Sequence, residues 1–251
     1  MHPVIATLST LILFFAPGLL LVAALNASKT KLQLTFGEQL YLVIAGSLLV
    51  SGWAGLLLAE LGRFSAVRVA MVVGGLVLVV LVGALLTRKH LSLRPGALGW
   101  DELAVLVCLI GFGVTVYFPP FEYILGGRDP GVYVNTGFHL AREGNLTYVD
   151  PVVLSVPEEE RGLFFRVDKD LPLWSQPRFL GFHMDSPDSG KISPQGLHLY
   201  PVWIGIASHL FEMKAGLYAT PFFALIGVAG LFLALRRLFN TEVALWASGM
   251  M

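Results

Sequence analysis

The residues best suited to chemistry lie in the stretch GGRDPGVYVNTGFHLAREGNL, residues 126–146. Arg128 and Asp129 stand side by side between two glycines and Pro130, where the only long polar region of the chain opens. A carboxylate that is partly desolvated near a bilayer can take a proton from an acceptor hydroxyl, and an arginine can balance a leaving phosphate. The alternative is that Asp129 merely caps a helix while Arg128 lies near lipid headgroups. The local sequence leaves both interpretations open.

Pro130 and Gly144 delimit the element that must position this pair. The residue before a proline is restrained from helical geometry, whereas the proline itself suits the first turn of a helix. We therefore expect Asp129 to be the N-cap of a helix from Pro130 to Glu143 and Gly144 to be its C-cap. The apolar positions fit an amphipathic helix along the membrane interface only loosely.

The chain as a whole has the composition of a membrane protein. Of its 251 residues 55% are hydrophobic and only 14% are charged, against about 25% charged residues in an ordinary soluble domain. The net charge of zero gives no indication of a nucleic-acid partner. The single cysteine, Cys108, allows neither an intrachain disulfide nor a metal-binding spacing.

Six apolar segments predict the architecture. A helix needs about 20 residues to cross about 30 Å of hydrocarbon. The segments are 4–25, 40–58, 67–86 and 103–118 before the polar region, and 197–211 and 217–235 after it. We expect an all-α polytopic membrane protein with about six transmembrane helices and one long external loop, 119–195, that contains interfacial helices.

Charges in the short loops predict the orientation. Two of these loops carry five basic residues, namely Lys29, Lys31, Arg88, Lys89 and Arg94, and the loop between them carries Arg63 and Arg68. If the five charges are cytoplasmic, the N-terminus and residues 119–195 are external. With six spans, Arg236 and Arg237 would then also face outside, against the rule. The expected location is the plasma (inner) membrane, as a multi-pass integral protein.

Other polar residues of the loop have weaker patterns. HMDSPD, residues 183–188, places two acids and a histidine close together, although Asp185 and Asp188 are more typical of a proline-containing turn. His139, His183 and His198 lack the spacing of a zinc motif.

The order of three motifs resembles the N-terminal part of the membrane-embedded GT-C glycosyltransferases, which include protein mannosyltransferases and lipid A aminoarabinose transferases. The motifs are DPGVYVNTGFHLAREGN, the return SPQGLHLYPVWIGIASHLF, and a following span that ends in RRLF. In that family an acidic residue at the start of the first external loop acts in sugar transfer, and Asp129 matches it. Tyr200 and Pro201 match the motif at entry into the next span, and residues 236–239 match the end of the span after it. The resemblance covers about residues 100–251.

The resemblance implies a glycosyltransferase that moves a sugar from a polyprenyl-phosphate-linked donor to an acceptor hydroxyl at the external membrane face. Asp129 would be catalytic, and Arg128, Tyr133 and Tyr200 would bind substrate. Pro130 occupies the place of the family's usual second acidic residue, which leaves a divalent metal cofactor open.

The same resemblance divides the chain into a three-span region, 1–99, and the start of a GT-C-like module, 100–251. The expected partners are the lipid-linked sugar donor, membrane lipids and either a partner chain or a C-terminal half beyond this sequence. The alternative function is that of a non-catalytic polytopic membrane subunit whose external loop binds a partner or a glycan.

Overall fold

The computed structural model describes residues 2–28, 33–88, 90–121, 129–165, 177–179 and 181–251. The chain forms two compact units. The helix unit consists of Met1–Ala54, Val67–Pro120 and Tyr218–Met251, and the loop unit consists of Gly55–Ala66 and Phe121–Leu217. The predicted boundary between residues 99 and 100 marks where the resemblance to GT-C enzymes begins. It does not describe how the helices pack, and it stays a prediction.

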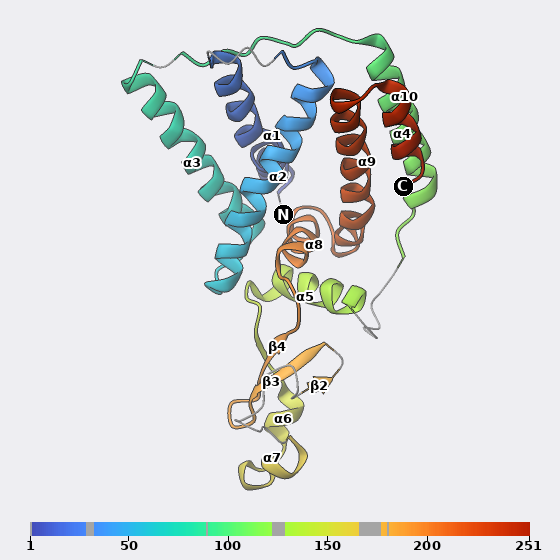
Figure 1. The fold of residues 1–251 in the computed structure, drawn as a ribbon. Coiled ribbons are helices and arrows are strands. Elements are labelled where there is room, and N and C mark those ends of the chain that lie inside the picture. The colour runs from blue at the N-terminus through green and yellow to red at the C-terminus, as the bar shows by residue number, and fades with distance from the viewer. Residues whose placement is uncertain (1, 29–32, 89, 122–128, 166–176, 180) are drawn as a thin grey trace. The chain divides into compact units, whose positions relative to one another are not determined.

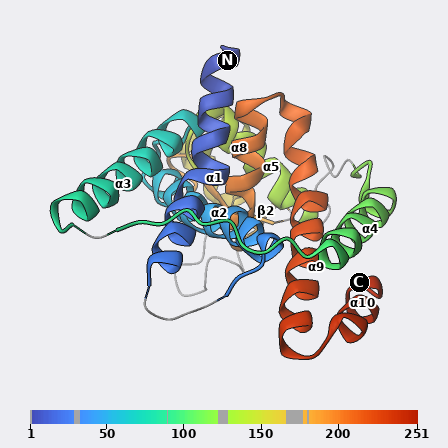
Figure 2. The same cartoon turned by 90° about the horizontal axis from the view of Figure 1, so that it is seen from above.

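Five helices among the described residues are long and apolar enough to cross a membrane. They are α1 (Pro3–Ala27), α2 (Phe36–Glu60), α3 (Ala66–Leu86), α4 (Trp100–Tyr117) and the continuous helical stretch Met213–Leu238, which comprises the 3₁₀ helix η2 (Met213–Tyr218) and α9 (Ala219–Leu238). A short helix, α10 (Thr241–Gly249), follows and packs on α9 and α4. Figure 2 shows α3 at an edge of the helix unit, beside α1 and α2. The chain is therefore mostly helical and has the features of a multi-pass integral membrane protein.

The sixth predicted span is a short helix instead. Residues 197–211 contain α8 (Leu199–Leu210), which has 12 residues. At 1.5 Å per residue this helix is about 18 Å long, well short of a hydrocarbon core of about 30 Å. Val202, Ile204 and Ile206 on α8 are completely buried within the protein. An apolar helix can be buried in a protein core as well as in lipid. The length of α8 distinguishes a buried helix from a membrane span here.

Small residues set the spacing between α1 and α2. The Gly18 amide donates to the Ser47 hydroxyl at 2.8 Å, and the Ser51 hydroxyl donates to the Leu13 carbonyl at 2.8 Å. A Cβ atom on Gly18 would collide with the carbonyl oxygen of Val43. Lipid tails provide no hydrophobic drive for association, so close backbone approach and such hydrogen bonds hold membrane helices together.

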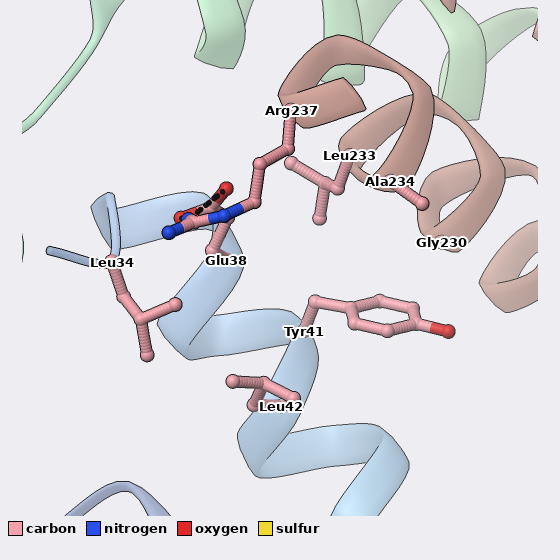
Figure 3. Close-up of a pocket in the computed structure, with 8 residues that line it drawn as sticks. All are labelled: Leu34, Glu38, Tyr41, Leu42, Gly230, Leu233, Ala234 and Arg237. Carbon is pink, nitrogen blue, oxygen red and sulfur yellow. Dashed lines mark hydrogen bonds and ion pairs between the residues drawn. The ribbon is translucent and has the colours of Figure 1, made fainter. Parts of the chain in front are cut away.

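Ion pairs connect the end of α9 to the beginnings of α2 and α4. Thr35 and Glu38 form a capping box at the start of α2, with the Thr35 amide 2.9 Å from Glu38 Oε2 and the Glu38 amide 3.2 Å from Thr35 Oγ1. Arg237 pairs with both oxygens of Glu38 at 3.0 and 2.8 Å, as Figure 3 shows. Arg236 pairs with the buried Glu102 of α4. These pairs bring three helix ends of the helix unit together.

The loop unit combines short helices with a small sheet. Its elements are α5 (Asp129–Glu143), β1 (Tyr148–Val149), α6 (Pro151–Ser155), α7 (Glu158–Phe164), β2 (Pro177–Phe179), β3 (Phe182–Ser186), β4 (Lys191–Pro194) and α8 (Figure 1). The strands are antiparallel in the order β1-β4-β3-β2. Val153, Met184 and Ile192 form a core on this sheet. Sequence reasoning predicted only helices in this region, because strands of two to five residues carry too few alternations to be seen.

The predicted helix at the opening motif is confirmed. It begins at Asp129 and ends at Glu143, so Asp129 is the first helical residue rather than the expected N-cap before Pro130. Gly144 has a φ of +76°, and its amide donates to the Leu140 carbonyl at 3.0 Å, as expected of a glycine C-cap.

Candidate functional site

Close packing of α5 against α8 builds the candidate site. The two helices lie side by side in the loop unit (Figure 1). Gly137 makes this possible, since a Cβ atom there would lie 2.5 Å from Cβ of Ile204 and 2.9 Å from the carbonyl oxygen of Pro201. Gly205 faces it, with its own added Cβ only 3.2 Å from the Gly137 carbonyl oxygen. The helix backbones therefore approach as closely as paired glycines permit.

This packing brings two predicted substrate-binding residues into contact. Tyr133 of α5 and Tyr200 of α8 meet edge to face, with ring centroids 5.7 Å apart and ring planes at 88°. Both rings remain half-buried. Edge-to-face geometry at this distance is a favourable aromatic arrangement, so the two rings hold each other in place.

Asp129 lies on the same face of α5 as Tyr133. Residues four apart in a helix are neighbours on its surface, so the carboxylate stands one turn before the tyrosine. Asp129 is exposed, and within the described residues its side chain has no hydrogen bond or ion pair. The carboxylate is thus accessible beside an aromatic pair. Arg128, the fourth predicted residue, lies outside the described residues.

Gly196 is a neighbour of the tyrosine pair that sequence reasoning missed. Its φ of +97° is a conformation that side chains disfavour. An added Cβ would lie 3.2 Å from Cε1 and 3.3 Å from the hydroxyl oxygen of Tyr133. The glycine therefore leaves room around the Tyr133 hydroxyl as the chain enters α8. Its position in PQGLHLYP was a readable signal of a special backbone conformation.

Residues 55–66 fix the far end of α5 and the start of α8. The Phe64 amide donates to the Gly144 carbonyl at 2.8 Å. Nδ1 of His198, the residue before α8, lies 3.0 Å from Oε1 of Glu60. His198 thus has a structural contact two residues before Tyr200, which the sequence alone did not suggest.

A second polar group holds the sheet to α6. Asp150 accepts from the Val152 amide at 2.9 Å and pairs with Nε of Arg178 at 2.7 Å. The Arg178 guanidinium also lies 5.0 Å from the centre of the Phe165 ring. Burial raises the pKa of the nearby Tyr148 phenol above its ordinary value, the Asp150 charge raises it further, and the Arg178 charge lowers it. Tyr148 therefore stays neutral at neutral pH, and its ring contacts those of His139 and Phe182.

The HMDSPD stretch is divided between the strand β3 and the turn that follows it. His183 and Asp185 lie on β3, and the register of β3 against β4 shifts at Asp185. Asp185 accepts a hydrogen bond from Ser193 and lies 3.7 Å from Nζ of Lys191. His183 is 7% exposed, and neither ring nitrogen has a hydrogen-bond partner in the part of the chain that the structure describes. Asp185 is thus held within the β3–β4 pair rather than in a turn. Asp188, by contrast, lies in the turn 187–190, where the Gly190 amide donates to the Pro187 carbonyl at 3.2 Å, as expected for this residue.

Metal-binding residues do not gather in the described part of the chain. It contains no group of three or more His, Cys, Asp or Glu side chains placed to hold one ion. Asp129 is followed directly by Pro130, which has no ligand atom in its side chain. The residues described around Asp129 therefore do not make up a donor set for a divalent cation.

Comparisons with known proteins add no family. No protein-family model matches the chain, and no curated protein and no solved structure is significantly similar to it. The resemblance to GT-C glycosyltransferases stays a prediction, and a function must be argued from the arrangement around Asp129.

Proposed function

We propose that this chain is a membrane glycosyltransferase of the GT-C type, which transfers a sugar from a polyprenyl-phosphate-linked donor to an acceptor hydroxyl. The observation that carries the proposal is the exposed carboxylate of Asp129, which has no partner among the described residues and lies one helical turn from Tyr133, whose ring packs on Tyr200. A proton acceptor beside an aromatic surface suits the binding and activation of a sugar or of its acceptor.

The residues divide the chemistry as follows. The donor keeps its polyprenyl tail in the bilayer and presents its phosphate-linked sugar at the membrane surface. Asp129 takes the proton of the acceptor hydroxyl, and the acceptor oxygen bonds to the anomeric carbon. The bond from that carbon to the phosphate oxygen breaks, and the phosphate leaves with the electron pair. Tyr133 and Tyr200 hold the sugar by ring contact, and Arg128 balances the phosphate charge.

The proposal includes an external position for the segment 119–195. With five spans, Arg236 and Arg237 fall at the same end of the helix unit as Arg88 and Arg94, the two described members of the five basic residues in the short loops. Their pairs with Glu38 and Glu102, which begin α2 and α4, support that placement. Six spans would have placed Arg236 and Arg237 outside, against the positive-inside rule. With five spans this exception does not arise, and the rule favours a cytoplasmic location for the end of the helix unit that carries these arginines.

Cysteine labelling tests the orientation. In a Cys108→Ala background, Thr87→Cys places a thiol just after α3 and Glu159→Cys places one in α7. We expect a membrane-impermeant maleimide to label the Glu159→Cys protein on intact cells and the Thr87→Cys protein only after permeabilisation. The reverse pattern would refute the external position.

Substitution of Asp129 tests the catalytic role. Membranes that contain the chain are supplied with polyprenyl-phosphate donors carrying different sugars, and transfer to endogenous acceptors is measured. Loss of a general base lowers the rate by about 10²- to 10⁴-fold, so Asp129→Asn should abolish detectable transfer at unchanged protein level. Glu143→Gln is the matched control, since Glu143 is an exposed acid at the other end of α5. Equal transfer by the two variants would remove Asp129 from the mechanism, and transfer no greater than that of membranes without the chain would favour the non-catalytic subunit.

A further inference from the structure

Two adjoining pockets lie where α1 and α2 meet the segment that leads to α4. The first has a volume of about 340 Å³ and mainly apolar walls. The second, called the polar pocket below, has a volume of about 470 Å³, and Asn26, Gln33, Thr35, Gln39 and Arg94 give it polar groups that the first pocket has fewer of. Asn26, Gln39, Arg94 and Pro95 line both pockets, so the two open into each other. Each volume is in the range of small-molecule sites.

The apolar pocket is a groove along two helices. Phe15, Leu19 and Val22 line it from α1, and Phe36, Leu40 and Val43 line it from α2. From Phe15 to Asn26 the groove follows α1 over about 16 Å at 1.5 Å per residue. Leu19 and Leu40 are each more than 40% exposed within the protein. The groove thus has the direction, length and chemistry to hold an extended hydrocarbon chain.

A short strap closes the end of this groove. The side-chain amides of Asn26 and Gln39 each donate to the Arg94 carbonyl oxygen at 3.1 Å. The Gly96 amide donates to Oε1 of Gln39 at 3.0 Å. Backbone hydrogen bonds from Ser92 to Ala23 at 3.1 Å and from Phe36 to residue 97 at 3.1 Å fix the strap on both sides. The site is therefore built by directed contacts.

Arg94 supplies the charge of the polar pocket. Its backbone carbonyl holds the strap, whereas its guanidinium is exposed and makes no ion pair within the described residues. The described residues that line this pocket include no carboxylate, and their other side chains are neutral. By contrast, Arg237 in the neighbouring pocket of Figure 3 is neutralised by Glu38. The positive charge of Arg94 in the polar pocket therefore has no anionic partner among the described residues, and an anionic ligand would supply one.

We infer that the paired pockets bind one anionic phospholipid, with an acyl chain in the groove of α1 and α2 and the phosphate headgroup on Arg94. Basic pockets between transmembrane helices recognise such headgroups. A free phosphate would leave the apolar groove unused, and a zwitterionic headgroup would place its cation in a pocket without a carboxylate. The inference is independent of the proposed sugar transfer, because it concerns other residues.

Lipid binding to the intact chain in detergent tests the inference. Binding of phosphatidylglycerol and of phosphatidylcholine with the same acyl chains is measured by native mass spectrometry. We expect phosphatidylglycerol to bind at least tenfold more tightly. Arg94→Gln should weaken the binding of phosphatidylglycerol by about 10- to 100-fold, as expected for the loss of a hydrogen bond to a charged group. The substitution keeps the backbone carbonyl that holds the strap.

Matched controls separate this site from general attraction to a basic surface. Arg88→Gln removes a charge from the same connection but lines neither pocket, and it should change the affinity by less than twofold. Leu40→Trp fills the groove and should weaken the binding of phosphatidylglycerol at least tenfold. Leu49→Trp changes an exposed position elsewhere on α2 and should leave this binding unchanged. Equal effects of Arg94→Gln and Arg88→Gln would overturn the inference. So would unchanged binding by Leu40→Trp, or competition by inorganic phosphate at the concentration of the lipid.

Discussion

The tightest contact of the candidate site is Gly137, and enlarging it by one methyl group gives a quantitative test. In Gly137→Ala the new Cβ must lie 2.5 Å from Cβ and Cγ2 of Ile204 and 2.9 Å from the Pro201 carbonyl oxygen. Ordinary contacts of this kind need about 3.5–4.0 Å, so α8 has to move by about 1 Å. Ile204 is completely buried and β-branched, which leaves it little freedom to turn aside.

The expected cost follows from two opposing terms. Overpacking a well-packed core costs about 1–3 kcal/mol. Replacing glycine by alanine inside a helix returns up to about 1 kcal/mol through helix propensity. Gly162→Ala in α7 shows the propensity term alone, because an added Cβ there has no neighbour within 4 Å. The difference between the two variants should therefore be about 1–3 kcal/mol in the free energy of unfolding.

Thermal unfolding of the detergent-solubilised chain measures this difference. Trp203 is 6% exposed and adjoins Ile204, so its fluorescence reports on α8. For a unit of about 100 residues each kcal/mol shifts the midpoint by about 4–8 °C. Movement of α8 by about 1 Å also separates Tyr200 from Tyr133, and sugar transfer should fall more steeply than stability. A Gly137→Ala midpoint equal to or above that of Gly162→Ala would refute the close helix contact.

Two further predictions concern charges. Glu102→Gln leaves Arg236 without its buried carboxylate and should destabilise the helix unit by about 3–5 kcal/mol. Thermal aggregation in detergent measures the loss of stability. Asp101→Asn, at the neighbouring exposed position, should have little effect. Tyr148→Phe should reduce the loss of stability that the protein shows between pH 9 and 11. Burial raises the pKa of the Tyr148 phenol in the folded state above the value of about 10 that it has in the unfolded chain. The stabilising contribution of the phenol is therefore complete below about pH 10 and is lost as the pH rises toward the pKa of the folded state. Denaturation midpoints of the variant and the wild type that fall in parallel with pH would contradict the second prediction.

How far the sequence could be interpreted depended on whether a signal was local. The helix α5 was predictable because Pro130 and Gly144 act on their own backbone conformation. The capping box of α2 was equally readable, since Thr35 and Glu38 stand at the required spacing. Such features require no knowledge of distant residues, and in both cases the residue types match the structure.

The contacts that form the candidate site could not be found in this way. Tyr133 and Tyr200 meet only because Gly137 and Gly205 allow α5 and α8 to approach. The resemblance pointed to both tyrosines, but nothing in their local sequence indicates that they touch. The apolar composition of α8 predicted a span, because composition does not distinguish burial in protein from burial in lipid.

The number of spans shows how the assignment of one short helix alters a functional argument. Counting α8 as a crossing places Arg236 and Arg237 at the end of the helix unit opposite the other basic residues, and so weakens the external assignment of 119–195. In the structure α8 is too short, and both arginines pair with carboxylates that begin α2 and α4. Apolar faces are solvated equally well by lipid wherever they lie, whereas charged groups must find a partner or the aqueous boundary. The partners of the charged residues are therefore better evidence for the topology of this chain than the lengths of its apolar segments.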